Sequence, residues 1–75
     1  MTLGDIANGK AFRILHLAST GEIRQRLLEM GFVRGAIGRV LREALLKDPI
    51  ELEMLGYKVS LRRAEANDIF VEEIE

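Results

Sequence analysis

The chain contains no cysteine, which excludes disulfide bonds, thiolate metal sites and cysteine nucleophiles. Its single histidine, His16, has no second histidine beside it, and a zinc-type site needs several such ligands. No His–acid arrangement accompanies Ser19, Thr20 or Ser60, as a hydrolytic triad would require. We therefore expect no catalytic residue, no bound metal and no cofactor, and we interpret His16 as an ordinary strand residue.

Long hydrophobic runs are also missing. No apolar run approaches the 18 residues of a membrane-spanning helix, and MTLGDIANGK has no basic segment followed by an apolar core. The 75 residues are enough for one small domain, which we place over residues 1–75. The lack of cysteine fits a reducing compartment such as the cytosol but does not by itself establish one.

The chain as a whole has almost no excess of one charge, but its two parts differ in sign. The formal net charge is −1, yet residues 1–47 carry eight Lys/Arg against four Asp/Glu, and residues 48–75 carry three against eight. The basic side chains of the first half are Lys10, Arg13, Arg24, Arg26, Arg34, Arg39, Arg42 and Lys47. A nucleic-acid footprint would need a basic domain and exposed aromatics for stacking, so we expect no nucleic acid and favour a solvated or protein-docking face.

The predicted elements are short. Residues 11–17 and 36–43 are apolar enough for strands, and Ala64–Asn67 and residues 3–8 suit helical turns, the latter opened by a Thr2–Asp5 capping box. A Ser19–Glu22 capping box predicts a helix over residues 20–30 with an apolar stripe. Gly31 ends this helix, with Phe32 packing back on its last turn, and a last strand follows over residues 68–73.

A hairpin is the most specific structural prediction. If Leu55-Gly56 forms the tip, the strands 50–54 and 57–62 place apolar residues opposite each other on one face and polar residues on the other. The apolar pairs are Met54–Tyr57, Leu52–Val59 and Ile50–Leu61, and the polar pairs are Glu53–Lys58 and Glu51–Ser60. Five short strands with small helices predict a mainly β fold that curls into a small barrel.

Two stretches, RLLEMGFVRG and DPIELEMLGYKVSLRRAEA, give the chain a family resemblance. With the opening TLGDIANGKAFRIL, they make nearly the whole chain similar to the ferrous iron transport protein A (FeoA) family. The resemblance implies an SH3-like barrel and a non-enzymatic, cytoplasmic accessory role in bacterial Fe²⁺ uptake. The implied partner is the membrane ferrous iron transporter, which carries a cytosolic G-protein domain.

The sequence departs from the family pattern at four positions. Arg34 and Leu45 stand where the family often has proline, Lys47 where it has glycine, and Leu55 where it has a polar or basic residue. Loss of proline makes a loop less rigid, and lysine adopts positive φ less readily than glycine.

We predict a partner-binding face made of the loop and the hairpin tip, flanked by arginines: Leu45, Leu46, Lys47, Met54, Leu55, Arg24 and Arg34. Two alternatives remain open at this point. One is a regulatory module related to the C-terminal domain of metal-dependent transcriptional repressors, which the arginines favour. The other is direct Fe²⁺ handling through His16 and carboxylates. Exposed strand edges also leave a homo-oligomer open.

Overall fold

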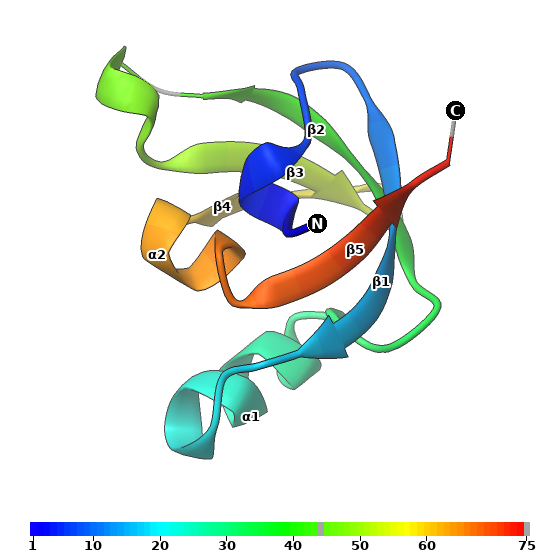
Figure 1. Ribbon diagram of the computed structural model, residues 1–75, viewed down its shortest axis with the longest axis vertical. Helices are drawn as coiled ribbons and strands as arrows, with labels where there is room; N and C mark the ends of the chain where they lie inside the picture. The colour runs from blue at the N-terminus through cyan, green and yellow to red at the C-terminus, as the bar shows by residue number, and fades with distance from the viewer. Residues whose placement is uncertain (44, 75) are drawn as a thin grey trace.

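Five antiparallel strands form one bent sheet in the computed structural model, which describes residues 1–43 and 45–74. The strands are β1 (Ala11–Leu17), β2 (Ile37–Glu43), β3 (Ile50–Met54), β4 (Tyr57–Leu61) and β5 (Ile69–Glu73), in the sheet order β4-β3-β2-β1-β5 (Figure 1). The helices of the described chain are α1 (Gly21–Glu29) and α2 (Arg63–Ala66), with 3₁₀ turns η1 (Leu3–Asp5) and η2 (Leu45–Lys47). None of these helices is long and apolar enough to cross a membrane.

The β3–β4 hairpin has the predicted register at every position. Its pairs run from Met54 opposite Tyr57 at the tip to Ile50 opposite Leu61 at the base. Leu55 and Gly56 connect the strands with φ angles of +50° and +87°. Positive φ at both central residues is the mark of a type I′ turn, whose twist matches that of the strands.

A β-bulge explains why the alternation in β1 is imperfect. Phe12 and Ile14 are fully buried, but the pairing of β1 with β5 shifts between Ile14 and His16. Leu15 and His16 are therefore both exposed, and Leu17 returns to the core. Strict alternation over residues 11–17 would place His16 on the face of Phe12 and Ile14, but the extra residue of the bulge turns the following side chains over.

The C-terminal end of α1 is as predicted. Gly31 has φ +101°, and the Phe32 N–H donates to the Leu27 carbonyl at 3.0 Å. Phe32 itself is fully buried. Gly31 thus closes the helix in the left-handed conformation and returns the chain to the core.

The N-terminal end of α1 differs from the prediction. Thr20 is the N-cap residue, and its side chain makes no capping hydrogen bond in the described part of the chain. The Ser19 hydroxyl is buried without a hydrogen-bond partner there, so the predicted Ser19–Glu22 capping box is wrong. Ile23 is 50% exposed, which leaves Leu27 as the buried anchor, with Met30 only partly buried.

The predicted closure into a barrel is also wrong, although the mainly β fold of five short strands with small helices is confirmed. The two end strands, β4 and β5, do not pair with each other in the described sheet. α2 connects them instead (Figure 1). The outer side of β5 is covered by the first residues of the chain, since Thr2 bridges Phe70 and the Val71 N–H donates to the Met1 carbonyl at 3.1 Å.

One apolar core fills the bend of the sheet. Its buried members come from all five strands, both α-helices and η1, and include Leu3, Phe12, Ile14, Leu27, Phe32, Val40, Leu52, Met54, Leu61, Ala66 and Ile69. The η1 turn, shorter than the predicted turn over residues 3–8, supplies Leu3, and the Asp5 carboxylate accepts a hydrogen bond from the Thr2 N–H at 2.8 Å. Gly38 lies where a Cβ would be 2.4 Å from Met54 Sδ, so β2 approaches the core without a side chain there.

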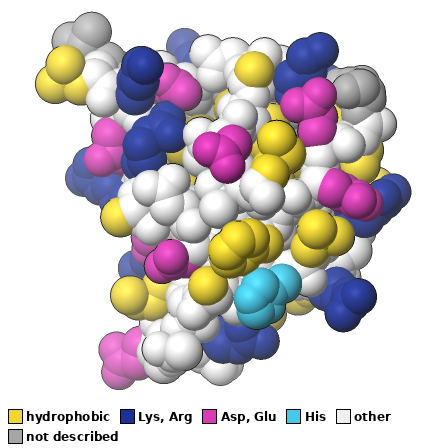
Figure 2. All heavy atoms as spheres, viewed as in Figure 1, with side chains coloured by type: hydrophobic (Ala, Val, Ile, Leu, Met, Phe, Trp, Pro, Cys, Tyr) yellow, Lys and Arg dark blue, Asp and Glu magenta, His cyan; other side chains and the backbone are white. Residues whose placement is uncertain are grey.

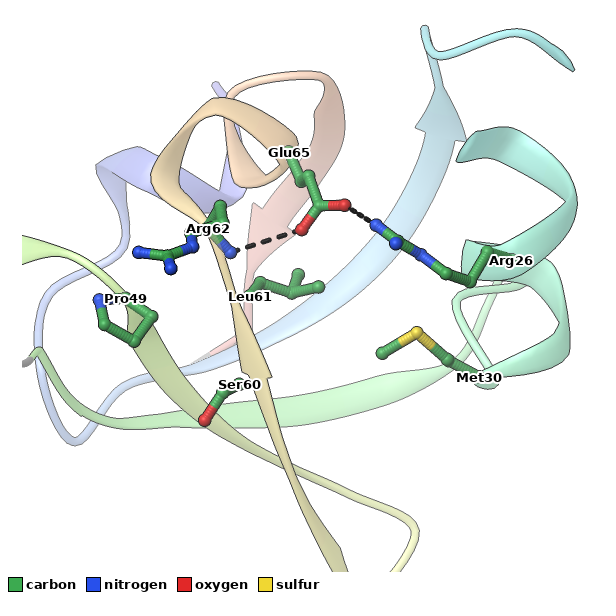
Figure 3. A pocket seen from close by; sticks show the side chains of 7 residues that line it. All are labelled: Arg26, Met30, Pro49, Ser60, Leu61, Arg62 and Glu65. Atoms are coloured by element: carbon green, nitrogen blue, oxygen red, sulfur yellow. Dashed lines mark hydrogen bonds and ion pairs between the residues drawn. The ribbon is translucent and has the colours of Figure 1, made fainter. Parts of the chain in front are cut away.

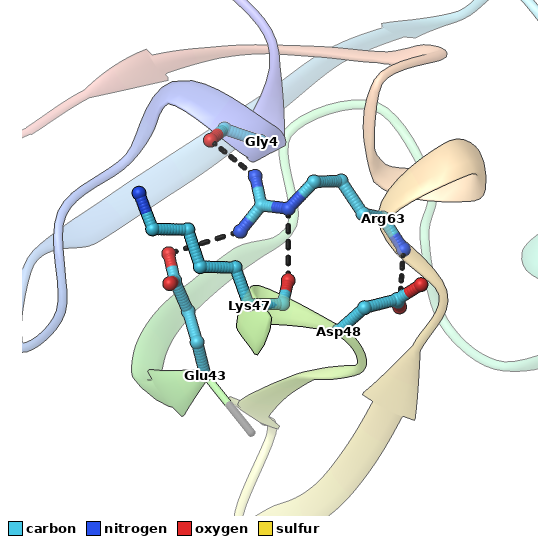
Figure 4. A network of polar contacts seen from close by, with 5 residues as sticks. All are labelled: Gly4, Glu43, Lys47, Asp48 and Arg63. Carbon is cyan, nitrogen blue, oxygen red and sulfur yellow. Dashed lines mark hydrogen bonds and ion pairs between the residues drawn. The ribbon is translucent and has the colours of Figure 1, made fainter. Parts of the chain in front are cut away.

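Arg63 ties four segments together at the base of the hairpin (Figure 4). Its guanidinium donates to the carbonyls of Gly4 at 3.0 Å and Lys47 at 2.9 Å, and to the Glu43 carboxylate at 2.9 Å. Its backbone N–H donates to the Asp48 carboxylate at 3.0 Å. All three guanidinium nitrogens are thereby used, which the fixed fork of arginine allows and a lysine does not.

Replacing this arginine should therefore destabilise the whole domain. We expect Arg63→Met to lower the free energy of unfolding by about 2 kcal/mol or more, because a carboxylate and two carbonyls lose their donor. Urea denaturation followed by circular dichroism measures this loss. The matched control is Arg62→Met, since the neighbouring Arg62 side chain makes no hydrogen bond or ion pair in the described structure. Equal stability of the two variants would contradict the assigned role.

The hairpin tip generates a second prediction. Leucine is a poor residue for the left-handed conformation that Leu55 adopts, whereas asparagine tolerates it well. Leu55→Asn should raise the free energy of unfolding by about 0.5–1 kcal/mol, whereas Leu55→Ala, which keeps the unfavourable backbone preference, should not. Urea midpoints of the two variants decide the matter, and an alanine variant as stable as the asparagine variant would disprove the explanation.

Candidate partner-binding surfaces

The predicted site residues do not form one face. The loop with Leu46 and Lys47 lies where β3 begins, and the tip with Leu55 lies where β3 ends, so the length of the strand separates them (Figure 1). Met54 is fully buried against Gly38, so its side chain cannot contact a partner on the folded protein. The side chain of Leu45 lies outside the described part of the structure.

Leu46 is the most exposed large hydrophobic residue of the described chain, at 90%. It has φ +67° and Lys47 has φ +64°, so lysine occupies the left-handed conformation that glycine would favour there. The Lys47 carbonyl is held by Arg63. The loop is thus fixed by its backbone, with the Leu46 side chain in solvent.

Leu55, 75% exposed, lies beside a shallow hollow at the other end of the hairpin. The hollow has a volume of about 180 Å³, and the partly exposed Ile37 of β2 also lines it. Arg39 and Glu53 lie at the same hollow, so its charges are mixed. Nothing in this arrangement favours a partner of one charge over another.

Arg24 and Arg34 come together at a third place. They line a hollow of about 230 Å³ with the bulge residues Leu15 and His16, and none of the described residues that line it is acidic. The Arg24 guanidinium donates to the Leu17 carbonyl at 3.2 Å. Arg34 is exposed and makes no ion pair or side-chain hydrogen bond within the described residues.

Phe70 of β5 completes this third surface. Its ring stacks on His16 with the ring centroids 5.5 Å apart and the planes at 30°. Figure 2 shows the histidine, the only one in the chain, with hydrophobic side chains beside it and basic side chains nearby. We call Leu15, His16, Arg24, Arg34 and Phe70 the basic–apolar surface.

Sequence reasoning found the two arginines of this surface but missed the other three residues. Leu15 and His16 are exposed together only because of the bulge, and Phe70 reaches them only through the pairing of β1 with β5. The one available signal was the broken alternation of residues 11–17, which is a sign of a bulge.

A larger pocket, of about 410 Å³, lies between α1, α2 and the base of β4 (Figure 3). Arg26 of α1 and Glu65 of α2 form an ion pair across it, and Met30, Leu61 and Arg62 also line it. No three histidine or acidic side chains of the described residues lie close enough together to hold a metal ion.

The comparisons with known proteins agree over nearly the full chain. The FeoA domain matches residues 1–73. A Porphyromonas gingivalis Fe(2+) transport protein A/Fe(2+) transporter FeoB fusion protein is 40% identical over 96% of this chain, which spans 8% of that protein's length. The solution structure of a Chlorobium tepidum FeoA protein is 37% identical, with a TM-score of 0.94 over all of this chain and 71% of its own.

A more distant structure indicates the fold. It is a Stenotrophomonas maltophilia FeoA complexed with zinc and described as a prokaryotic SH3 domain protein. It is 24% identical, with a TM-score of 0.85 over 96% of this chain and 89% of its own. The full-length domain match and the relatives above 30% identity go further than the fold: this chain belongs to the FeoA family of ferrous iron transport proteins.

Proposed function

We propose that the chain is a non-enzymatic, cytoplasmic accessory protein of ferrous iron uptake that docks on the cytosolic part of the membrane Fe²⁺ transporter and modulates it. The observation that carries this proposal is the Porphyromonas gingivalis fusion protein, in which the related domain and a ferrous iron transporter share one polypeptide. Where a domain of this family is not joined to its transporter in one polypeptide, it must find the transporter by binding, which requires a docking surface.

The basic–apolar surface is the best candidate for that docking. Its centre is apolar and aromatic, and its rim is cationic without an acidic neighbour in the hollow. Interfaces commonly combine an apolar centre with a charged rim, and complementary charge speeds and orients association. The partner face on the transporter is therefore expected to place acidic side chains around an apolar centre.

Leu46 and Leu55 stay predictions as partner contacts. Each is a single exposed leucine on a left-handed backbone, and the two lie at opposite ends of β3. A single exposed apolar residue is ordinary on a protein surface. We therefore place the main contact at the basic–apolar surface and use the leucines to test that choice.

Charge reversal at Arg34 tests the docking directly. Because this guanidinium has no internal partner in the described structure, Arg34→Glu should leave the stability unchanged and weaken binding to the transporter's cytosolic domain roughly fivefold. Amide shifts of labelled protein titrated with that domain measure the affinity. Lys10→Glu carries the same charge change on an exposed residue outside this hollow and should bind as the unmodified chain does. If both variants weaken binding equally, the effect comes from the change in net charge and not from the hollow.

Fe²⁺ uptake by cells tests the same surface through the proposed function. Leu15→Asp places a charge in the apolar centre of the surface, so it should lower transporter-dependent Fe²⁺ uptake in cells that lack the chromosomal copy. Leu46→Asp and Leu55→Asp make the same change at the other two places and should support normal uptake. If Leu46→Asp or Leu55→Asp fails to support uptake while Leu15→Asp supports it, the docking face lies at the end of the hairpin that carries the failing substitution.

A further inference from the structure

The two edge strands of the sheet differ in whether another segment pairs with their outer side. The outer side of β5 is covered, because Thr2 bridges Phe70 and Met1 accepts a hydrogen bond from Val71. No described segment pairs with the outer side of β4. An uncovered edge strand presents unpaired backbone donors and acceptors, to which another extended chain can add.

The register identifies which backbone groups of β4 are available. In a two-residue hairpin the residues next to the turn form a hydrogen-bonded pair, and hydrogen-bonded and non-hydrogen-bonded pairs then alternate. Tyr57, Val59 and Leu61 therefore use their N–H and C=O groups toward β3. The N–H and C=O groups of Lys58 and Ser60 point away from the sheet, and neither residue has a backbone hydrogen bond outside its strand in the described chain.

The pocket of about 410 Å³ lies at the Ser60–Leu61 end of this edge (Figure 3). Ser60, Leu61 and Arg62 all line it, although successive residues of a strand point to opposite faces. A pocket lined by three successive residues must lie at the edge of the strand. Met30 and Leu61 give the pocket an apolar part of its lining. A bound segment would therefore find both backbone hydrogen-bonding groups and an apolar surface here.

The charges at the edge favour one kind of occupant. Lys58 and Arg62 are exposed and form no ion pair in the described structure. Because they lie two residues to either side of Ser60, all three side chains are on the same face of the sheet. Arg26 is neutralised by Glu65. A second copy of this chain, added antiparallel, would bring its own lysine and arginine to the same face, where like charges repel.

We propose that β4 is a strand-addition site for an extended peptide segment of a partner in which acidic and apolar residues alternate. Backbone hydrogen bonds to Lys58 and Ser60 hold the segment in place. Its acidic side chains lie on the face of Lys58 and Arg62, and its apolar side chains lie on the opposite face, over Leu61 and Met30. This site lies at β4, α2 and the C-terminal end of α1, and it shares no residue with the basic–apolar surface. It does not depend on the docking proposed above.

The test uses the whole chain and a synthetic peptide of alternating glutamate and valine with blocked ends. Titration of isotope-labelled protein should shift the amides of residues 57–62 and slow hydrogen exchange at Lys58 and Ser60. A peptide with lysine in place of glutamate should bind at least tenfold more weakly. The absence of shifts at β4, or equal binding of the two peptides, would overturn the proposal. Shifts that appear with protein concentration alone would assign the edge to a second copy instead.

Two sets of variants separate backbone pairing from charge. Ser60→Pro removes one outward N–H at an edge, where proline is tolerated, and should weaken binding at least tenfold. Ser60→Ala keeps that N–H and should bind normally. If Ser60→Pro does not fold, the double variant Lys58→Glu and Arg62→Glu decides, because it should prefer the lysine peptide to the glutamate peptide. Unchanged binding by Ser60→Pro, or an unchanged preference of the double variant, would refute strand addition by an acidic segment.

Discussion

The hydrogen bonds of the Arg63 guanidinium are the constraint on which the arrangement of the hairpin depends. They join the first turn, the end of β2 and the loop before β3 to α2, four segments that no continuous strand pairing connects. A chain of this size has a small core, so apolar burial alone leaves little margin for holding such loops. The arginine does this with donors aimed at two carbonyls and one carboxylate.

The candidate binding features all arise where the regular sheet is interrupted. The bulge in β1 exposes two successive side chains, the uncovered edge of β4 leaves backbone groups free, and the turns at Leu46 and Leu55 place leucines in solvent. Regular, fully paired strands with one buried face expose few apolar side chains and few unpaired backbone groups. In this fold, the candidate binding features therefore coincide with irregular segments, whereas the core and the Arg63 contacts hold the surrounding structure.

Local patterns predicted the hairpin and the end of α1 correctly, although the equally local Ser19–Glu22 capping box was wrong. The β3–β4 register followed from alternation around Leu55-Gly56, and the end of α1 followed from Gly31. The grouping of the predicted partner residues depended on geometry over longer distances, which local patterns do not give. Met54 was assigned to the surface although its apolar alternation already placed it inside, and the loop and tip were grouped although a whole strand separates them. The bulge, which decides the position of His16, is set by the pairing with β5 and has only a faint trace in the sequence.

The pairing of β1 with β5 joins residues far apart along the chain, as the Arg13–Glu72 ion pair shows across 59 positions. Contacts of such separation carry a large entropic cost of loop closure, so the local β3–β4 hairpin is expected to form early and β1–β5 late. The stacking of His16 on Phe70 belongs to the late pairing. The basic–apolar surface therefore exists only on the completely folded chain, and a partner that binds it stabilises the native state by mass action.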